Sequence, residues 1–199
     1  MRVLIACEFS GIVREAFHKK GHDSWSCDLL PTEIEGNHYQ GDIFDILYDN
    51  WDLVIAHPPC TYLSLMGIWW NAKRPERWEE TFKALEFVKK IWSAPVEKMS
   101  LENPIGYLNN HWMKPTQIIH PWQFGQEFFK ATCLWTRNLP LLVPTKIVDR
   151  GEYYINKNGI KVAKWSHTTT GRLKEKRAKI ASRTFEGIAN AMADQWSNT

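Results

Sequence analysis

Residues 53–64 (Leu-Val-Ile-Ala-His-Pro-Pro-Cys-Thr-Tyr-Leu-Ser) constrain the fold more than any other stretch of this sequence. The apolar, β-branched run that opens the stretch is too short for a helix and predicts a buried strand. Pro58 and Pro59 must end that strand, because neither supplies an N–H group and both fix φ. Cys60 is therefore held at a rigid strand end. There it is either a positioned nucleophile or a small buried hydrophobic residue, the usual role of a free cysteine.

Strands and helices alternate along the chain. Short apolar runs predict strands at 2–7, 22–27, 52–56, 98–101 and 131–136, with a weaker strand before Gly41 and a hairpin at 153–165 around an Asn-Gly turn. Helices are predicted at 12–20, at 75–92 (with Trp78, Phe82, Leu85, Val88 and Ile91 at helical spacing) and within 173–196 (with Ile180, Ile188, Met192 and Trp196 facing inward). This alternation predicts an α/β fold with a mostly parallel, doubly wound sheet. Because no repeat or linker divides the chain, residues 1–199 are expected to form a single domain.

Polar residues cluster where the predicted strands end. In parallel sheets, ligands bind beyond the carboxyl ends of the strands. The residues at those ends are Glu8 to Gly11, Asp28, Asp42, His57 to Cys60, and Glu102 with Asn103. Gly11 lets the backbone approach a ligand at a helix start, and Asp28 is placed to accept hydrogen bonds from ribose hydroxyls. Each residue alone is more often a turn residue, but their common edge predicts a nucleotide site.

Basic residues are concentrated near the end of the chain. Residues 146–183 hold 11 of the 25 Lys and Arg but only 3 of the 22 acidic residues, a charge of +8 that leaves −5 on the rest. Such a patch on an acidic body favours a polyanion partner, although a solvated helix face is the commoner origin of a charge run. The 11 tryptophans include candidates for base stacking, with core packing as the alternative role.

Several classes of protein are disfavoured by the sequence. The four cysteines are widely spaced and show neither a disulfide framework nor a zinc-ligand spacing. No apolar run approaches the roughly 18 residues that span a bilayer, and the amino terminus lacks the layout of a signal peptide. We therefore expect a cytoplasmic protein without a metal or a membrane partner.

The strand-end residues resemble the motifs of the DNA (cytosine-5) methyltransferases. The matching segments are Phe9-Ser-Gly-Ile12, Gly21-His22 with Ser26-Cys27-Asp28, Gly41-Asp42-Ile43, Asp52 through Pro-Pro-Cys60 with Ser64, and Leu101-Glu102-Asn103. The first is similar to the family's methyl-donor loop, the fourth to its catalytic Pro-Cys motif and the last to its Glu-Asn-Val motif. The likeness covers roughly residues 3–105.

The resemblance implies a Rossmann-like, S-adenosylmethionine-dependent methyltransferase fold and a covalent mechanism. Cys60 would add to carbon 6 of cytosine, and Glu102 would hold the exocyclic amine and protonate ring nitrogen 3. S-adenosyl-L-methionine would contact Phe9, Ser10, Gly11, Ile12, Asp28, Leu29, Asp42, Ile43 and Pro58. The substrate would contact Pro59, Ser64, Asn103 and Lys130. The partner would be DNA, duplex or single-stranded, or a cytosine nucleotide.

The chain also departs from the family pattern. Val13 and Arg14 replace two glycines of the methyl-donor loop, and no Gln-x-Arg-x-Arg motif is found. Lys130 is the candidate substitute for an arginine of that motif. No stretch is long enough for a target-recognition domain, so the chain is similar to compact bacteriophage proteins, which would place it in a host cytoplasm. Only 146–183 then remains to contact nucleic acid.

Three functions follow from these features. The first is methylation of cytosine at carbon 5. The second is methylation of an amino group, because Pro58-Pro59 also fits the Asp/Asn-Pro-Pro-Tyr/Phe motif of amino-group methyltransferases, although His57 and Cys60 replace its acid or amide and its aromatic residue. The third is a nucleic-acid or nucleotide-binding protein that has kept the fold and lost catalysis.

Overall fold

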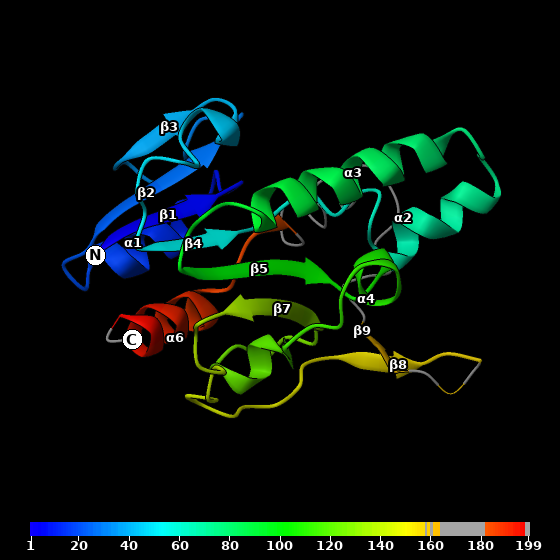
Figure 1. Ribbon diagram of the computed structural model, residues 1–199. Helices are drawn as coiled ribbons and strands as arrows, with labels where there is room; N and C mark the ends of the chain where they lie inside the picture. Colours follow the sequence, from blue (N-terminus) through cyan, green and yellow to red (C-terminus); the bar gives the residue numbers. More distant parts are fainter. Residues whose placement is uncertain (158, 160, 164–181, 198–199) are drawn as a thin grey trace.

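A seven-stranded, mostly parallel sheet forms the centre of the computed structural model, which describes residues 1–157, 159, 161–163 and 182–197 (Figure 1). Its strands lie in the order β3-β2-β1-β4-β5-β7-β6, and β8 and β9 form a separate hairpin. Their bounds are β1 Arg2–Ala6, β2 Asp23–Asp28, β3 His38–Gln40, β4 Leu53–Ala56, β5 Lys98–Pro104, β6 Gln117–Ile119, β7 Thr132–Arg137, β8 Tyr153–Ile155 and β9 Lys161–Ala163. Strands β1 to β5 pair in parallel, whereas β7 runs antiparallel to both β5 and β6. The predicted α/β fold with a mostly parallel sheet is confirmed and is compatible with a Rossmann-like fold.

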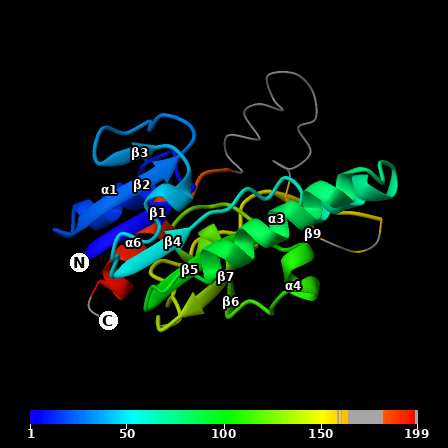
Figure 2. The same cartoon turned by 45° about the horizontal axis from the view of Figure 1, so that its top comes forward.

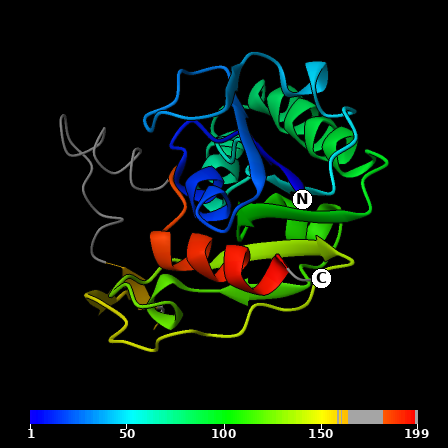
Figure 3. The same cartoon turned by 90° about the vertical axis from the view of Figure 1, so that its left-hand side faces the viewer.

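Helices cover both faces of this sheet (Figures 2 and 3). Their bounds are α1 Ile12–His18, α2 Leu65–Trp69, α3 Arg77–Trp92, α4 Tyr107–His111 and α6 Glu186–Trp196, with short 3₁₀ turns η1 Ile43–Asp45, η2 Trp70–Ala72 and η3 Pro121–Gln123. Alternate residues of β1 serve the two faces: Val3 and Ile5 pack with α1 and α6, while Leu4 and Ala6 pack with the end of α3. No helix of the described residues is both long and apolar enough to cross a membrane.

The packing of the two long predicted helices is partly as expected. In α3, Leu85, Val88 and Ile91 are buried, but Trp78 and Phe82 are 36% and 51% exposed. The helical spacing predicts both rings on the apolar face, but the start of α3 extends past the end of β5 (Figure 1). The Trp78 ring there lies 5.9 Å from the ring of Tyr107 in α4. In α6, Ile188, Met192 and Trp196 are buried as predicted. Ile180 lies outside the described residues, as does the whole stretch 164–181 of the basic segment 146–183.

The strand β5 is longer than the sequence predicts, and three short elements were not predicted. The strand predicted at 98–101 continues to Pro104, because Asn103 pairs with Cys133 and Pro104 with Thr132 in the antiparallel ladder with β7. Elements α2, α4 and β6 have five, five and three residues, which is too short to reveal a hydrophobic period. The predicted hairpin is confirmed by the antiparallel pairing of β8 with β9.

The segment that follows β4 is anchored on both sides. The His57 N–H donates to the Ala6 carbonyl at 2.9 Å, which continues the pairing of β4 with β1. On the other side, the Leu63 carbonyl accepts a 2.7 Å hydrogen bond from the Tyr107 N–H. Gly106 allows this contact, because a Cβ atom there would lie 2.0 Å from the Leu63 oxygen.

Replacing Gly106 with alanine is therefore expected to lower the free energy of unfolding by roughly 1–3 kcal/mol, the usual cost of forcing atoms into filled space. Urea denaturation measures this change. The matched control is Asn110→Ala on the exposed side of α4, which should stay within roughly 0.5 kcal/mol of wild type. Wild-type stability of the Gly106→Ala variant would contradict the close approach of residue 106 to the Leu63 carbonyl.

Candidate active site

The Pro-Pro-Cys segment is held against the neighbouring strand. The Asn103 side chain donates a 2.8 Å hydrogen bond from Nδ2 to the Pro58 carbonyl. Beyond the prolines, the Cys60 carbonyl accepts hydrogen bonds from the N–H groups of Leu63 at 3.0 Å and Ser64 at 2.9 Å, which forms a turn. Cys60 is half-buried in this turn. Its thiol is thus positioned by backbone contacts rather than by packing in the core.

Glu102 and His57 form a polar pair beside Cys60. Nδ1 of His57 lies 3.3 Å from Oε2 of Glu102, and both side chains are largely buried, at 8% and 16% exposure. The hydroxyl of Thr184, which precedes α6, lies 3.5 Å from the same nitrogen. Burial alone raises the pKa of Glu102, but the hydrogen bond to His57 and the positive charge of Lys130 bring that pKa below its ordinary value. The resting carboxyl group is therefore ionised.

The thiol of Cys60 has the opposite tendency. Burial raises its pKa, and the negative charge of Glu102 raises it further, while Lys130 and a backbone hydrogen bond act to lower it. Cys60 is therefore a neutral thiol at rest and needs a proton acceptor to become a nucleophile. Glu102 is close enough to influence that proton.

Lys130 brings a third chain segment to the site. It precedes β7, and its charge acts on both Cys60 and Glu102. Its ammonium group lies 5.8 Å from the ring centroid of Phe185. The structure therefore brings together three of the predicted site residues, namely the Cys60 thiol after β4, the Glu102 carboxylate in β5 and the Lys130 ammonium group before β7.

Two buried polar atoms next to this cluster have no hydrogen-bond partner in the described part of the chain. They are Nε2 of His57 and Oδ1 of Asn103. Such atoms are rare in folded proteins, because leaving a buried donor or acceptor unpaired costs roughly 1–3 kcal/mol. Their position on either side of the Pro-Pro-Cys segment is consistent with polar groups kept for a ligand.

The turn after β1 has the left-handed glycine expected of a ligand-binding loop, but its helix start is already capped. Gly11 has φ +73° and precedes α1. The buried carboxylate of Glu8 accepts hydrogen bonds from the N–H groups of Val13 at 2.8 Å and Arg14 at 3.2 Å, and from the Ser10 hydroxyl at 3.0 Å. Ser10 is therefore buried, whereas its neighbours Phe9 and Ile12 are half-buried.

Arg14 occupies the space beside this turn. Its side chain is 1% exposed. Its guanidinium group donates to neutral oxygens, namely the hydroxyls of Ser26 and Thr32 and the carbonyls of Ile34 and Glu35. A Cβ atom at Gly11 or Gly36 would lie 2.9 Å from it. Arg14 thus fills the gap between two glycine-containing turns.

Residues 29–37, here called the cover segment, lie over the same turn. The Glu33 N–H donates to the Phe9 carbonyl at 2.9 Å, and the Glu33 carboxylate forms an ion pair with Arg183. Arg183 directly precedes Thr184, the partner of His57. The cover segment therefore connects the predicted methyl-donor loop to the predicted catalytic residues.

The remaining predicted residues have less uniform surroundings. Asp28 ends β2 half-buried, and its Oδ1 accepts from the Leu30 N–H at 2.9 Å. Leu29 beside it is 74% exposed. Asp42 is exposed and caps η1 by accepting from the Phe44 N–H at 3.0 Å.

Of three more predicted site residues, two have a structural role and the third is exposed. Ile43 is buried in the core, and the Ser64 hydroxyl caps α2 by accepting from the Gly67 N–H. Pro59 is exposed.

Sequence reasoning did not assign roles to His57, Thr184 or Glu8. His57 had a usable signal, since it immediately precedes the double proline at the end of a buried strand. Thr184 is more than 80 residues away from Glu102 along the chain, and only the packing of α6 brings it near. In the described residues, no group of His, Cys, Asp and Glu side chains is arranged to hold a metal ion.

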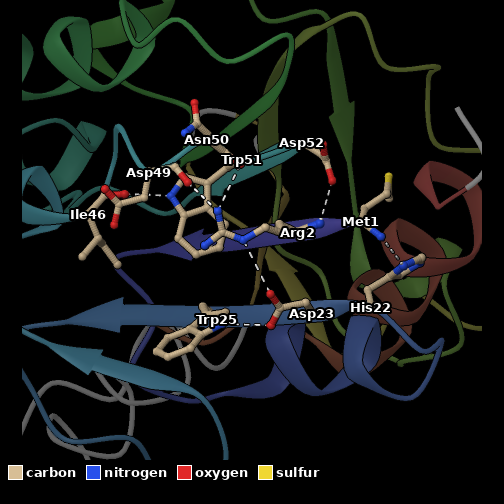
Figure 4. Close-up of polar contacts among 10 residues, drawn as sticks. All are labelled: Met1, Arg2, His22, Asp23, Trp25, Ile46, Asp49, Asn50, Trp51 and Asp52. Carbon is tan, nitrogen blue, oxygen red and sulfur yellow. Dashed lines mark hydrogen bonds and ion pairs between the residues drawn. The ribbon is translucent and has the colours of Figure 1, made fainter.

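The opposite, amino-terminal edge of the sheet has a surface hollow of about 720 Å³. Arg2 makes several polar contacts at this edge (Figure 4). Its backbone N–H donates to the Asp52 carboxylate at 2.7 Å, and its side chain donates to the Asp49 carbonyl. Its guanidinium group also forms an ion pair with Asp23 at 3.6 Å. Its guanidinium group also lies 4.6 Å from the Trp51 ring. These contacts tie β1, β2 and the turn before β4 together, so we assign this edge to stability.

The charges around Cys60 predict how its thiol reacts. Glu102→Gln removes a nearby negative charge, so the Cys60 pKa should fall and alkylation by iodoacetamide should begin at lower pH than in wild type. Lys130→Gln removes a positive charge and should shift the alkylation profile to higher pH. Peptide mass spectrometry across pH 6–10 separates Cys60 from the other three cysteines. Shifts in the same direction for both variants would contradict the proposed arrangement of charges.

No protein-family model matches this chain, and no curated protein matches it either. The function is therefore inferred from the residues at the carboxyl edge of the sheet.

Proposed function

We propose that this protein methylates carbon 5 of cytosine in DNA through a covalent adduct with Cys60. The observation that carries the proposal is the placement of Cys60 and Glu102 just beyond β4 and within β5, adjacent parallel strands, where the ionised Glu102 acts on the Cys60 thiol. A second supporting feature is the strand order, which reverses between β1 and β4, the place where such sheets bind nucleotides.

The protonation states at rest define the first step. The Cys60 thiol loses its proton, which reaches ring nitrogen 3 of cytosine by way of the Glu102 carboxylate. The sulfur forms a bond to carbon 6, and the electron pair of the carbon 5–carbon 6 double bond becomes available at carbon 5. Because the proton lost by the thiol neutralises the ring, no net charge accumulates on the base.

Neighbouring residues position this chemistry. His57 donates a hydrogen bond to Glu102 and fixes its orientation, while Lys130 stabilises both the carboxylate and the emerging thiolate. The unpaired Oδ1 of Asn103 is a suitable acceptor for a substrate amino group. After methylation, the carbon 5 proton is lost to solvent, its electron pair restores the carbon 5–carbon 6 double bond, and the carbon 6–sulfur bond breaks. The proton on ring nitrogen 3 returns by way of Glu102 to the departing Cys60 thiolate.

The residues at the ends of β1 and β2 fit the nucleoside part of S-adenosylmethionine. Asp28 uses one oxygen for a backbone N–H and retains acceptor capacity for ribose hydroxyls. Leu29 offers an exposed apolar surface for the adenine ring, and the Phe9–Ile12 turn lies alongside. When bound, the cofactor supplies an electrophilic methyl group for carbon 5.

Amino-group methylation is less well supported. That chemistry uses an acid or amide before the double proline to accept from the target amine, and this chain has His57 there. The Nδ1 of His57 is already engaged with Glu102, so only the ring nitrogen Nε2 is left for a substrate, and His57 lacks the carboxylate or amide oxygen that this chemistry uses.

A second candidate function has a specific observation in its favour. Arg14 and the cover segment fill the space next to Gly11, where the amino-acid part of the cofactor would otherwise approach the turn. A nucleic-acid-binding protein that has lost methyl transfer would tolerate such filling. This candidate keeps the fold and the basic sequence segment 146–183 and lacks the Cys60 chemistry.

Incubation with labelled S-adenosylmethionine and cytosine-containing DNA, followed by mass spectrometry of the nucleosides, tests the proposal. Wild type should yield 5-methylcytosine. Cys60→Ser should abolish the product, and Glu102→Gln should reduce its rate by roughly 10²-fold or more, as expected for loss of an acid–base group. The control is Asp49→Ala at the opposite edge of the sheet, whose rate should match wild type.

Three outcomes would contradict carbon-5 methylation. An N4-methylcytosine or N6-methyladenine product would support amino-group transfer. Wild-type turnover by Cys60→Ser would exclude the covalent step. Tight DNA binding by wild type with no modified base on any substrate form would support the binding protein.

A further inference from the structure

A cluster of exposed rings lies next to the Cys60 turn. Trp69 and Trp70 in α2 and η2 are 51% and 41% exposed, and Trp78 and Phe82 in α3 are 36% and 51% exposed. We call these four rings the aromatic platform. They belong to the part of α2 and α3 that extends past the carboxyl end of β5 (Figure 1). The ring centroids of Trp69 and Trp70 lie 5.0 Å apart, and those of Trp78 and Phe82 lie 5.9 Å apart. Contiguous exposed apolar rings of this kind are typical of a binding site rather than of solvated surface.

Cations are interleaved with the platform. The Lys73 ammonium group lies 4.2 Å from the ring centroid of Trp69 and 5.7 Å from that of Trp70, and the Arg74 guanidinium group lies 5.6 Å from the Trp70 ring. Within the described residues, neither cation has a carboxylate oxygen within 4.0 Å. Two nearby acids, Glu79 and Glu80, are both paired with Lys83. The Trp69 and Trp70 rings are therefore bordered by two cations that have no carboxylate partner in the described part of the chain.

Buried hydrogen bonds fix the platform relative to the candidate catalytic residue. Asn71, which follows Trp70, donates a 2.8 Å hydrogen bond to the Thr81 hydroxyl in α3. That hydroxyl donates in turn to the Tyr62 carbonyl at 3.2 Å, two residues after Cys60. Asn71 and Thr81 are 1% and 0% exposed. These hydrogen bonds connect the two helices to the Cys60 turn.

We propose that the aromatic platform binds single-stranded DNA next to the target base, with bases stacked on its rings and phosphates paired with Lys73 and Arg74. Aromatic side chains bordered by cations are the standard means of binding an unpaired strand. A duplex keeps its base faces inside the stack, so the exposed rings favour an unpaired strand. The proposal deepens the proposed function by naming the form of its substrate, and it rests on that function.

The same surface bears on how the substrate is held. A strand must be held in place while a cytosine meets Cys60. A platform joined to the Cys60 turn holds the neighbouring nucleotides without reading their sequence, because every base has a face that can stack. We therefore expect binding with little sequence preference.

Fluorescence anisotropy with a labelled 12-nucleotide thymidine strand tests the proposal without any cytosine. The double variant Trp69→Ala/Trp70→Ala should bind this strand at least about tenfold more weakly than wild type. Lys73→Gln/Arg74→Gln should flatten the plot of log affinity against log salt by roughly one unit, because up to two phosphate contacts are lost at about 0.7 each. The matched control is Tyr48→Ala, which removes a 52% exposed ring at the opposite edge of the sheet and should leave affinity unchanged. Thermal unfolding verifies that each variant is folded.

Three results would overturn the proposal. One is unchanged strand affinity in Trp69→Ala/Trp70→Ala. Another is tighter binding of the matching thymidine–adenosine duplex than of the single strand. The third is a wild-type dimer in sedimentation that this double variant converts to monomer, which would assign the rings to a second copy of the chain.

Different results would contradict the platform proposal and the methyltransferase proposal. If no base is methylated but the tryptophan variant loses strand binding, the platform stands and the methyltransferase proposal falls. If single-stranded cytosine is methylated with the same KM by wild type and the tryptophan variant, the methyltransferase proposal stands and the platform falls.

Discussion

The parallel pairing of β4 with β5 is the constraint on which the candidate site depends. Ala56 lies opposite Leu101 in this ladder, so the next residue on each strand, His57 and Glu102, emerge side by side. The double proline then ends β4, while β5 continues and pairs with β7. The result is a short, rigid loop that carries Cys60 over the end of a longer strand. A shift of one residue in this register would turn Glu102 to the other face of the sheet.

The electrostatics of the site follow from that geometry. Glu102 is a largely buried carboxylate that remains ionised because His57 donates to it and Lys130 lies nearby. Its negative charge raises the pKa of the Cys60 thiol and also makes Glu102 a suitable acceptor of the thiol proton. In the proposed mechanism, the carboxylate that keeps the Cys60 thiol protonated at rest is also the group that accepts its proton when a base is bound. A site of this kind limits the reactivity of Cys60 towards other electrophiles.

The sequence was sufficient for most of the sheet and for placing the strand-end residues at one edge of it, because both depend on local signals. The run from Leu53 to Pro59 identifies a strand and its end, and Glu102 follows another apolar run. His57 as the partner of Glu102 was not predictable, because that contact depends on the register between two strands 45 residues apart. The role of Arg14 was not predictable either, because it depends on how the cover segment folds back. The exposure of Trp78 was not predictable, because it depends on how far α3 extends beyond the sheet.

The most direct test of the central claim is covalent capture on DNA that contains 5-fluorocytosine. Fluorine at carbon 5 cannot be removed as a proton, so an enzyme that proceeds through a Cys60 adduct stays bonded to its substrate. With S-adenosylmethionine present, we predict a denaturation-resistant complex and a single modified peptide containing Cys60. A complex bonded through another residue, or methyl transfer to ordinary cytosine without any complex on the fluorinated strand, would contradict the mechanism.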